Sequence, residues 1–86
     1  MKVEHRLTIR SLCPVDGRQD LYQVFFRTQR VIKVEDILEA VAQHTKEPVF
    51  QEDLTKVLAK ILGCQVETRG WHGEVFTTVI CEGAKG

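Results

Sequence analysis

Hydrophobic and polar positions alternate at the start of the chain in a way that predicts two β-strands. Over residues 3–11, apolar residues and His5 fall on one side, while charged or polar residues fall on the other. A period of two is typical of a strand with one buried face. Residues 13–20 then include Pro, Asp and Gly, which favour turns, and the alternation resumes over residues 22–26. The first part of the chain is therefore expected to form a β-hairpin.

The period then changes to that of two amphipathic helices. Apolar residues at positions 34, 37, 38 and 41 predict a first helix that ends near Thr45. Pro48 suits the first turn of a second helix, whose apolar stripe runs from Phe50 to Leu62. Gly63 is a natural residue just past the C-terminus of that helix.

Alternating residues on either side of a turn predicted at residues 70–73 indicate a second β-hairpin. The order strand, strand, helix, helix, strand, strand predicts one α+β domain over residues 1–82. Its four-stranded antiparallel sheet is expected to be covered on one face by both helices. Residues 83–86 show no periodicity and are expected to form a frayed tail.

The predicted sheet has two edge strands whose backbone groups lack a partner. A domain of this size buries only about 60 % of the surface that its unfolded chain exposes, so a monomer has a small core. Pairing of edges between copies, as in a closed barrel, satisfies the backbone groups and enlarges the core. Self-association into a homo-oligomer is therefore expected.

Composition narrows the classes of partner. Lys and Arg number 12 and Asp and Glu also number 12, so no net charge draws the chain to nucleic acid or to an anionic membrane. The N-terminus alternates charged and apolar residues, unlike a signal peptide, and no apolar run approaches the roughly 18 residues of a membrane span. A cytoplasmic protein without nucleic-acid or membrane partners is expected.

The three cysteines are Cys13, Cys64 and Cys81, and none is in a C-x-x-C pair. Their number and spacing indicate reduced thiols, with no disulfide framework and no metal site. Cys64 and Cys81 follow the inward alternation of their strands and are expected to pack in the core. Cys13 ends a strand at a turn, where a thiol can be exposed and reactive.

Asp20 follows Cys13 by seven residues across the predicted turn. A thiolate that adds to a nitrile carbon needs a proton donor for the nitrogen, and a carboxylic acid across the same turn supplies one. The residues alone also allow a simpler interpretation, in which Asp16 and Asp20 cap turn amides and Cys13 merely packs.

The segment from Ser11 to Asp20 reads S-L-C-P-V-D-G-R-Q-D. It resembles the S-L-C-P-V-x-G-x-x-D signature of the 7-cyano-7-deazaguanine reductases, the nitrile reductases of queuosine biosynthesis. The predicted order of elements is also that of the tunnelling fold (T-fold), whose members bind purines and pterins between subunits. The resemblance implies a small heterocyclic ligand, a thioimide formed by Cys13, and Asp20 as proton donor.

The segment F-Q-E-D at residues 50–53 is similar to the F-H-E-D of those reductases, and Q-E-D-L-T at residues 51–55 resembles the Q-E-x-L-T of GTP cyclohydrolases. The resemblance implies that Glu52 anchors the purine or pterin, with Gln51 beside it. A carboxylate can accept two parallel hydrogen bonds from a guanine-like edge. Glu52 also suits the N-terminal turn of a helix for electrostatic reasons alone.

The sequence departs from the reductase pattern where NADPH is bound. The lysine- and serine-bearing segment expected near residues 34–35 is not recognisable, and Gln51 replaces the reductase histidine. The sequence therefore predicts no cofactor, although NADPH stays possible without a recognisable segment to bind it. Related archaeal amidinotransferases share the thioimide step without NADPH, so nitrile chemistry does not depend on that segment.

Other functions stay open. The C-E-H-H zinc-ligand segment of the cyclohydrolases is absent, which argues against a zinc enzyme. A non-catalytic oligomeric T-fold binding module and a pterin-processing aldolase-like enzyme are both alternatives. Trp71 and His72 at the second turn are candidates for base stacking and for a general acid, although an aromatic residue at a turn can equally cover a subunit edge.

Overall fold

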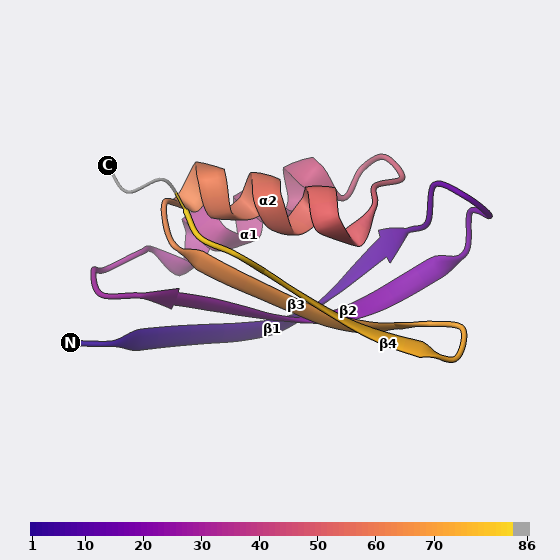
Figure 1. The fold of residues 1–86 in the computed structure, drawn as a ribbon. Coiled ribbons are helices and arrows are strands. Elements are labelled where there is room, and N and C mark those ends of the chain that lie inside the picture. Colours follow the sequence, from indigo (N-terminus) through magenta and orange to yellow (C-terminus); the bar gives the residue numbers. More distant parts are fainter. Residues whose placement is uncertain (84–86) are drawn as a thin grey trace.

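The computed structural model describes residues 1–83. Its elements in chain order are β1 (Val3–Leu12), β2 (Gln19–Thr28), α1 (Val34–His44), α2 (Gln51–Leu62), β3 (Gln65–His72) and β4 (Val75–Cys81). This order confirms the predicted α+β arrangement (Figure 1). A frayed tail was expected at residues 83–86, and residues 84–86 of it lie outside the described part of the chain. Within residues 1–83, no helix is long and apolar enough to cross a membrane.

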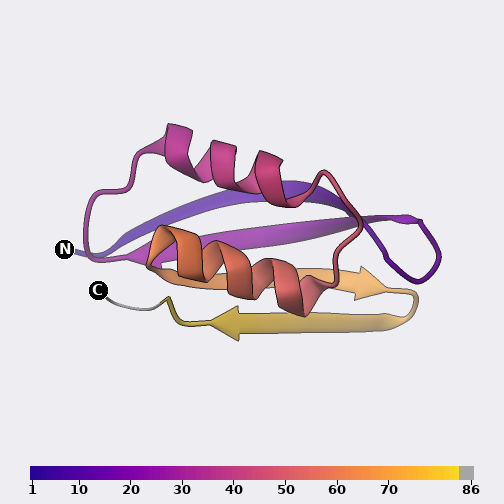
Figure 2. The same ribbon diagram turned by 90° about the horizontal axis from the view of Figure 1, so that it is seen from above.

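The four strands form one antiparallel sheet in the order β1-β2-β3-β4. Both helices lie on the same face of this sheet, with α1 on the β1 side and α2 alongside it over the middle strands (Figures 1 and 2). The register places Ile9 opposite Tyr22 and Tyr22 opposite Gly70. Strands β1 and β4 each pair with one neighbour in the described part of the chain, so both are edge strands.

The hydrophobic core fills the space between the helices and the sheet. Its largest apolar side chains with less than 2 % exposure are Tyr22, Phe26, Leu54, Leu58, Val24 and Val66. Alternate residues of β2 supply three of them because successive side chains of a strand point to opposite faces. Cys64 is buried in this core and Cys81 packs against it, which confirms the packing role predicted for both.

The apolar stripe predicted for α1 is only partly correct. Ile37 is buried as expected, but Val34 and Leu38 are more than half exposed, and Ala40 is buried in addition. Among the helices and strands, α1 packs mainly against α2, so residues at the margins of its stripe remain in solvent.

The N-terminus predicted for the second helix was wrong. Pro48 lies in the connection before α2, which begins at Gln51 with Phe50 in an extended conformation as its N-cap. The physical reason is that the Val49 amide donates to the Leu12 carbonyl oxygen at 3.0 Å, which holds this segment against the end of β1. The predicted C-terminus is confirmed by Gly63, which has φ of 62° and caps α2.

The second turn also differs from the prediction at residues 70–73. Strand β3 continues through His72, and the turn lies at Gly73, which has φ of 61°. Gly70 is a strand residue whose missing side chain admits the ring of Tyr22. A Cβ at position 70 would lie 2.5 Å from Tyr22 Cδ1 and 2.9 Å from the Leu21 carbonyl oxygen. Close packing, rather than turn geometry, explains this glycine.

The face of the sheet without helices has an ionic centre. Phe25 is 6 % exposed there because three guanidinium groups cover its ring, namely those of Arg6, Arg27 and Arg69 at 5.5, 5.1 and 4.3 Å. The Glu67 carboxylate accepts hydrogen bonds from Arg69 and from Arg27, and the Arg69 bond is the main cause of the lowered pKa of Glu67. Cation–π contacts and paired charges thus replace an apolar cover on this face.

Candidate functional site

Three parts of the chain meet at the end of the sheet that carries Cys13. They are the β1–β2 loop, the N-terminus of α2 and the β3–β4 hairpin, which lie together on the right of Figure 1. The bond between Val49 and Leu12 ties the start of α2 to the end of β1. Residues that are far apart in sequence therefore become neighbours at this end.

Backbone hydrogen bonds fix the loop that carries Cys13. The Cys13 amide donates to the Arg18 carbonyl oxygen at 2.8 Å, and the Gly17 amide donates to the Cys13 carbonyl oxygen at 2.9 Å. The Asp16 carboxylate accepts from the Arg18 amide at 2.9 Å, and this bond is the main cause of the lowered pKa of Asp16, to which the Cys13 thiol adds. Asp16 is thus the turn-capping residue, and Cys13 is half-buried in an ordered loop.

Asp20 lies at the start of β2 on the face that carries the helices, with 15 % of its side chain exposed. The Tyr22 hydroxyl, two residues further along the same face, donates to Asp20 Oδ2 at 3.2 Å. Asp20 therefore contacts a buried phenol instead of capping a turn amide.

The pKa of the Tyr22 hydroxyl is raised by burial and by three acidic groups. Burial raises the pKa of Tyr22 most, Asp20 raises it further, and negative charge on Cys13 and Glu52 adds to the effect. Charges act on a pKa appreciably when they are near. Of the predicted residues, Asp20 contacts this phenol directly, whereas Cys13 and Glu52 act on the pKa of Tyr22 through their charge.

Gln51 is 2 % exposed, and its amide is used entirely within the chain. Its Nε2 donates toward the Thr68 carbonyl oxygen at 3.2 Å, the Thr68 hydroxyl at 3.0 Å and the Thr77 carbonyl oxygen at 3.0 Å. The Thr55 hydroxyl donates to the Gln51 carbonyl oxygen at 2.7 Å and contacts the Thr68 hydroxyl at 2.6 Å. This network fastens the start of α2 to β3 and β4.

The free oxygen of the same amide reaches His72. Gln51 Oε1 lies 2.6 Å from His72 Nε2, and His72 Nδ1 lies 3.9 Å from Asp20 Oδ2. The His72 and Tyr22 rings are 5.9 Å apart between centroids. His72 therefore joins the group at Asp20 from the opposite hairpin.

Glu52 is exposed in the first turn of α2. In the described part of the chain, no side-chain hydrogen bond or ion pair engages its carboxylate. Phe50 provides no side-chain cap, so the N–H groups of this turn and the carboxylates of Glu52 and Asp53 face solvent together. A ligand edge with two donors could bind to Glu52 without breaking a contact in the chain.

Ser11 adds a buried hydroxyl beside these groups. It is 2 % exposed and pairs with Asp20 in the register of β1 and β2. Its Oγ has no hydrogen-bond partner among the described residues. Side chains at paired positions on one face lie about 4.5–5.5 Å apart at Cβ, so Ser11 belongs to the same cluster.

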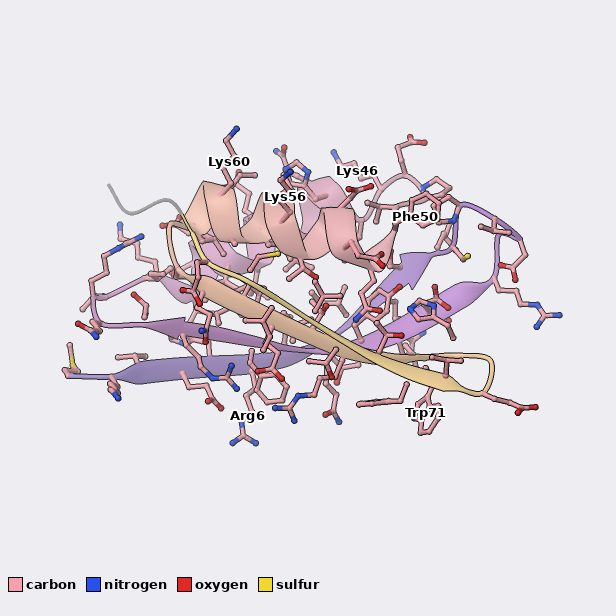
Figure 3. The ribbon with its side chains drawn as sticks, in the orientation of Figure 1. Arg6, Lys46, Phe50, Lys56, Lys60 and Trp71 are labelled. Carbon is pink, nitrogen blue, oxygen red and sulfur yellow. The ribbon has the colours of Figure 1, made fainter. Side chains whose placement is uncertain are left out.

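Trp71 does not belong to the cluster. It is 61 % exposed on the opposite face of the sheet, where it packs against Phe76 with ring centroids 5.0 Å apart. Figure 3 shows its side chain pointing away from the helices. The neighbouring residues Trp71 and His72 thus lie on different faces, as the alternation of a strand requires.

Two hollows in the described part of the chain lie at the other end of the sheet. One, of about 580 Å³, is lined by residues of α1 and the end of α2, and the other, of about 610 Å³, lies near the ends of β1 and β4. Within residues 1–83, no three His, Cys, Asp or Glu side chains are grouped as a metal site requires. The candidate site is therefore a cluster of reactive side chains at a surface formed by loop and hairpin.

The sequence did not point to Tyr22 as part of the site, and it offered His72 as a candidate general acid at a turn without indicating its partners. The signal for Tyr22 was present, because residues 20 and 22 share one face of a strand. The contact between His72 and Gln51 links residues 21 positions apart and depends on the register of the sheet.

The order and pairing of the elements are those of the tunnelling fold (T-fold). No protein-family model matches the sequence, and no curated protein matches it. Among solved structures, the chain is similar to the crystal structure of the archaeosine synthase QueF-Like in the apo form. The similarity has a TM-score of 0.80 at 18 % identity and covers 99 % of this chain and 95 % of that chain. The resemblance to QueF-like proteins thus holds at the level of the fold.

Proposed function

We propose that the chain binds a deazapurine that carries a nitrile and that Cys13 attacks the nitrile carbon to form a thioimide. The observation that supports this most is that the loop of Cys13, the start of β2 with Asp20 and the first turn of α2 with Glu52 lie at the same end of the sheet (Figure 1). A nucleophile, a proton-carrying acid and a hydrogen-bond acceptor are the three groups that the reaction requires. The fold shared with an archaeosine synthase gives the proposal further support.

The proposed covalent step is balanced without a redox partner. A bond forms between Cys13 Sγ and the nitrile carbon, and one π bond of the nitrile breaks. The proton lost from the thiol ends on the nitrile nitrogen, with Asp20 as the donor to that nitrogen. The product is a thioimide, and no leaving group departs in this step.

The chain does not fit NADPH at the segment where the reductase pattern would bind it. Val34 begins α1, at the other end of the sheet from Cys13 (Figure 1). The first turn of α1 carries the carboxylates of Glu35 and Asp36 in place of the lysine- and serine-bearing segment of the reductases. The proposed reaction therefore follows the amidinotransferase type, in which a nitrogen nucleophile replaces the cysteine, rather than hydride transfer.

Glu52→Gln is expected to weaken binding of guanine-like ligands by several-fold to about a hundredfold, or about 1–3 kcal/mol. The amide keeps the shape of the side chain but loses the charge and one of the two acceptors. Isothermal titration with 7-cyano-7-deazaguanine measures the effect, and Asp53→Asn, in the same exposed turn, is the matched control. Equal affinities for both variants would leave Glu52 as a helix-terminus charge alone.

Self-association is proposed to complete the site, because β1 and β4 are free edges and the site lies at the surface of one chain. Two copies can continue the sheet, since β1 and β4 run antiparallel. We expect elution well above the 9.8 kDa of the monomer and an unfolding midpoint that rises with protein concentration. A monomer whose midpoint is independent of concentration would contradict an intersubunit site.

Intact-mass spectrometry after incubation with 7-cyano-7-deazaguanine tests the proposed reaction. A thioimide adds the whole nitrile to the chain, so one ligand mass per chain is the expected result. A non-catalytic binding module or an aldolase-like enzyme retains the unmodified mass, and that result would refute the nitrile chemistry.

A further inference from the structure

We infer that His72 is a positioning residue that exchanges a proton with Asp20 and that Gln51 sets its tautomer. The inference rests on the proposed function, because Asp20 is the proton donor of the proposed step. It assigns a role to His72 that neither the motif around Cys13 nor the comparison with the solved structure provides. The contacts that support it are those of the Gln51 amide and of the two nitrogens of His72.

The surroundings of Gln51 settle which end of its amide faces His72. Two carbonyl oxygens and a hydroxyl surround one end, at 3.0–3.2 Å, and carbonyl oxygens accept only from a donor. That end is the NH₂ group, so the oxygen faces His72 Nε2 at 2.6 Å. An amide oxygen can only accept, and His72 must therefore carry a hydrogen on Nε2.

This tautomer leaves Nδ1 of neutral His72 with a lone pair directed to the side of the ring where Asp20 lies. Asp20 Oδ2 is 3.9 Å from Nδ1 and already accepts from the Tyr22 hydroxyl. Two acceptors that face each other bind one proton between them when they approach. Catalytic hydrogen bonds are often long in a ligand-free enzyme and shorten when the ligand binds.

The pair can serve the proposed step with no net gain or loss of protons. The thiol proton passes to the pair as the Sγ–C bond forms, and the pair returns a proton to the nitrile nitrogen as the π bond breaks. His72 holds the proton between these events, which lets Asp20 act first as acceptor and then as donor. After the step, Asp20 and His72 together hold the same number of protons as before it.

Other titratable groups lie near the pair. The Tyr22 hydroxyl on β2 donates to Asp20, and the charges of Cys13 in the β1–β2 loop and of Glu52 on α2 raise the pKa of Tyr22.

The first test is the tautomer of His72 in the ligand-free protein, measured from its ring nitrogens by ¹⁵N NMR. The chain has three histidines, so His72→Gln identifies the signals of His72 by their loss. We expect neutral His72 to be protonated on Nε2 and bare on Nδ1. Protonation on Nδ1 instead would overturn the role of Gln51 and the exchange with Asp20.

The second test is a double-mutant cycle on the rate of adduct formation. His72→Gln can still donate to Gln51 but cannot exchange a proton, and we expect it to slow the adduct about tenfold or more, as does Asp20→Asn. Because both residues act on one proton, the double variant should be no slower than the slower single variant. If the rate reductions of the two single variants multiply in the double variant, the inference is overturned. His44→Gln is the control and should form the adduct at the wild-type rate.

The two tests separate the inference from the proposed function. If the wild-type protein forms no adduct, the proposed nitrile chemistry fails, and the tautomer alone then supports or refutes the His72–Asp20 pair. If the adduct forms at the same rate in wild type and His72→Gln, the inference fails while the proposed function stands.

Discussion

Cys13→Ala is expected to abolish the nitrile adduct completely, with no detectable mass gain after incubation with 7-cyano-7-deazaguanine. The thiol is the atom that forms the new bond, and alanine offers no replacement. Cys13 is half-buried in a loop with an acid nearby, whereas Cys64 is in the core. Burial raises the pKa of the Cys64 thiol, so at neutral pH it stays protonated and unreactive.

Cys64→Ala is the matched control, because it removes a thiol from the core and leaves the loop unchanged. It should form the adduct as the wild type does. A mild alkylating agent should likewise modify Cys13 before the other two cysteines. If Cys64 or Cys81 reacts first in the native protein while Cys13 does not, the assignment of the nucleophile is wrong.

Gln51→Leu is expected to lower the free energy of unfolding by about 3 kcal/mol, which corresponds to a fall of roughly 15 °C in the melting temperature. Leucine is similar in size but leaves the Thr68 and Thr77 carbonyl oxygens and His72 without the amide that bonds them. A buried polar group that loses its partner costs about 1–3 kcal/mol. Urea denaturation measures the effect.

Gln43→Leu provides the comparison for this substitution, since Gln43 is exposed on α1. Its effect should stay within about 0.5 kcal/mol. Equal stabilities for the two variants would mean that the Gln51 network contributes little, and the proposed orientation of His72 would lose its support.

The strands were predictable from the sequence because one face of the sheet is buried and the other is not. The alternation of apolar and polar residues correctly predicts that Ile9 on β1 and Val24 on β2 are buried. Sequence periodicity could not show that Gly70 makes room for a ring on the adjacent strand, because that contact depends on register. Pro48 was misplaced for a similar reason, since a bond to Leu12 delays the start of α2.

The candidate site was predictable only in part. The spacing of Cys13 and Asp20 and the position of Glu52 in a helical first turn were visible in the sequence. Gln51 was expected beside a ligand, whereas in the free chain its amide is fully used by β3, β4 and His72. This network joins α2, β3 and β4, so it can be recognised only when the fold is known.

A crystal structure of the protein with 7-cyano-7-deazaguanine tests the central claim most directly, because it shows the ligand, the nucleophile and the anchor together. The account predicts continuous density between Cys13 Sγ and the former nitrile carbon, with the guanine-like edge on Glu52 and the nitrogen near Asp20. A ligand bound elsewhere, or bound at this site without contact to Cys13, would contradict it.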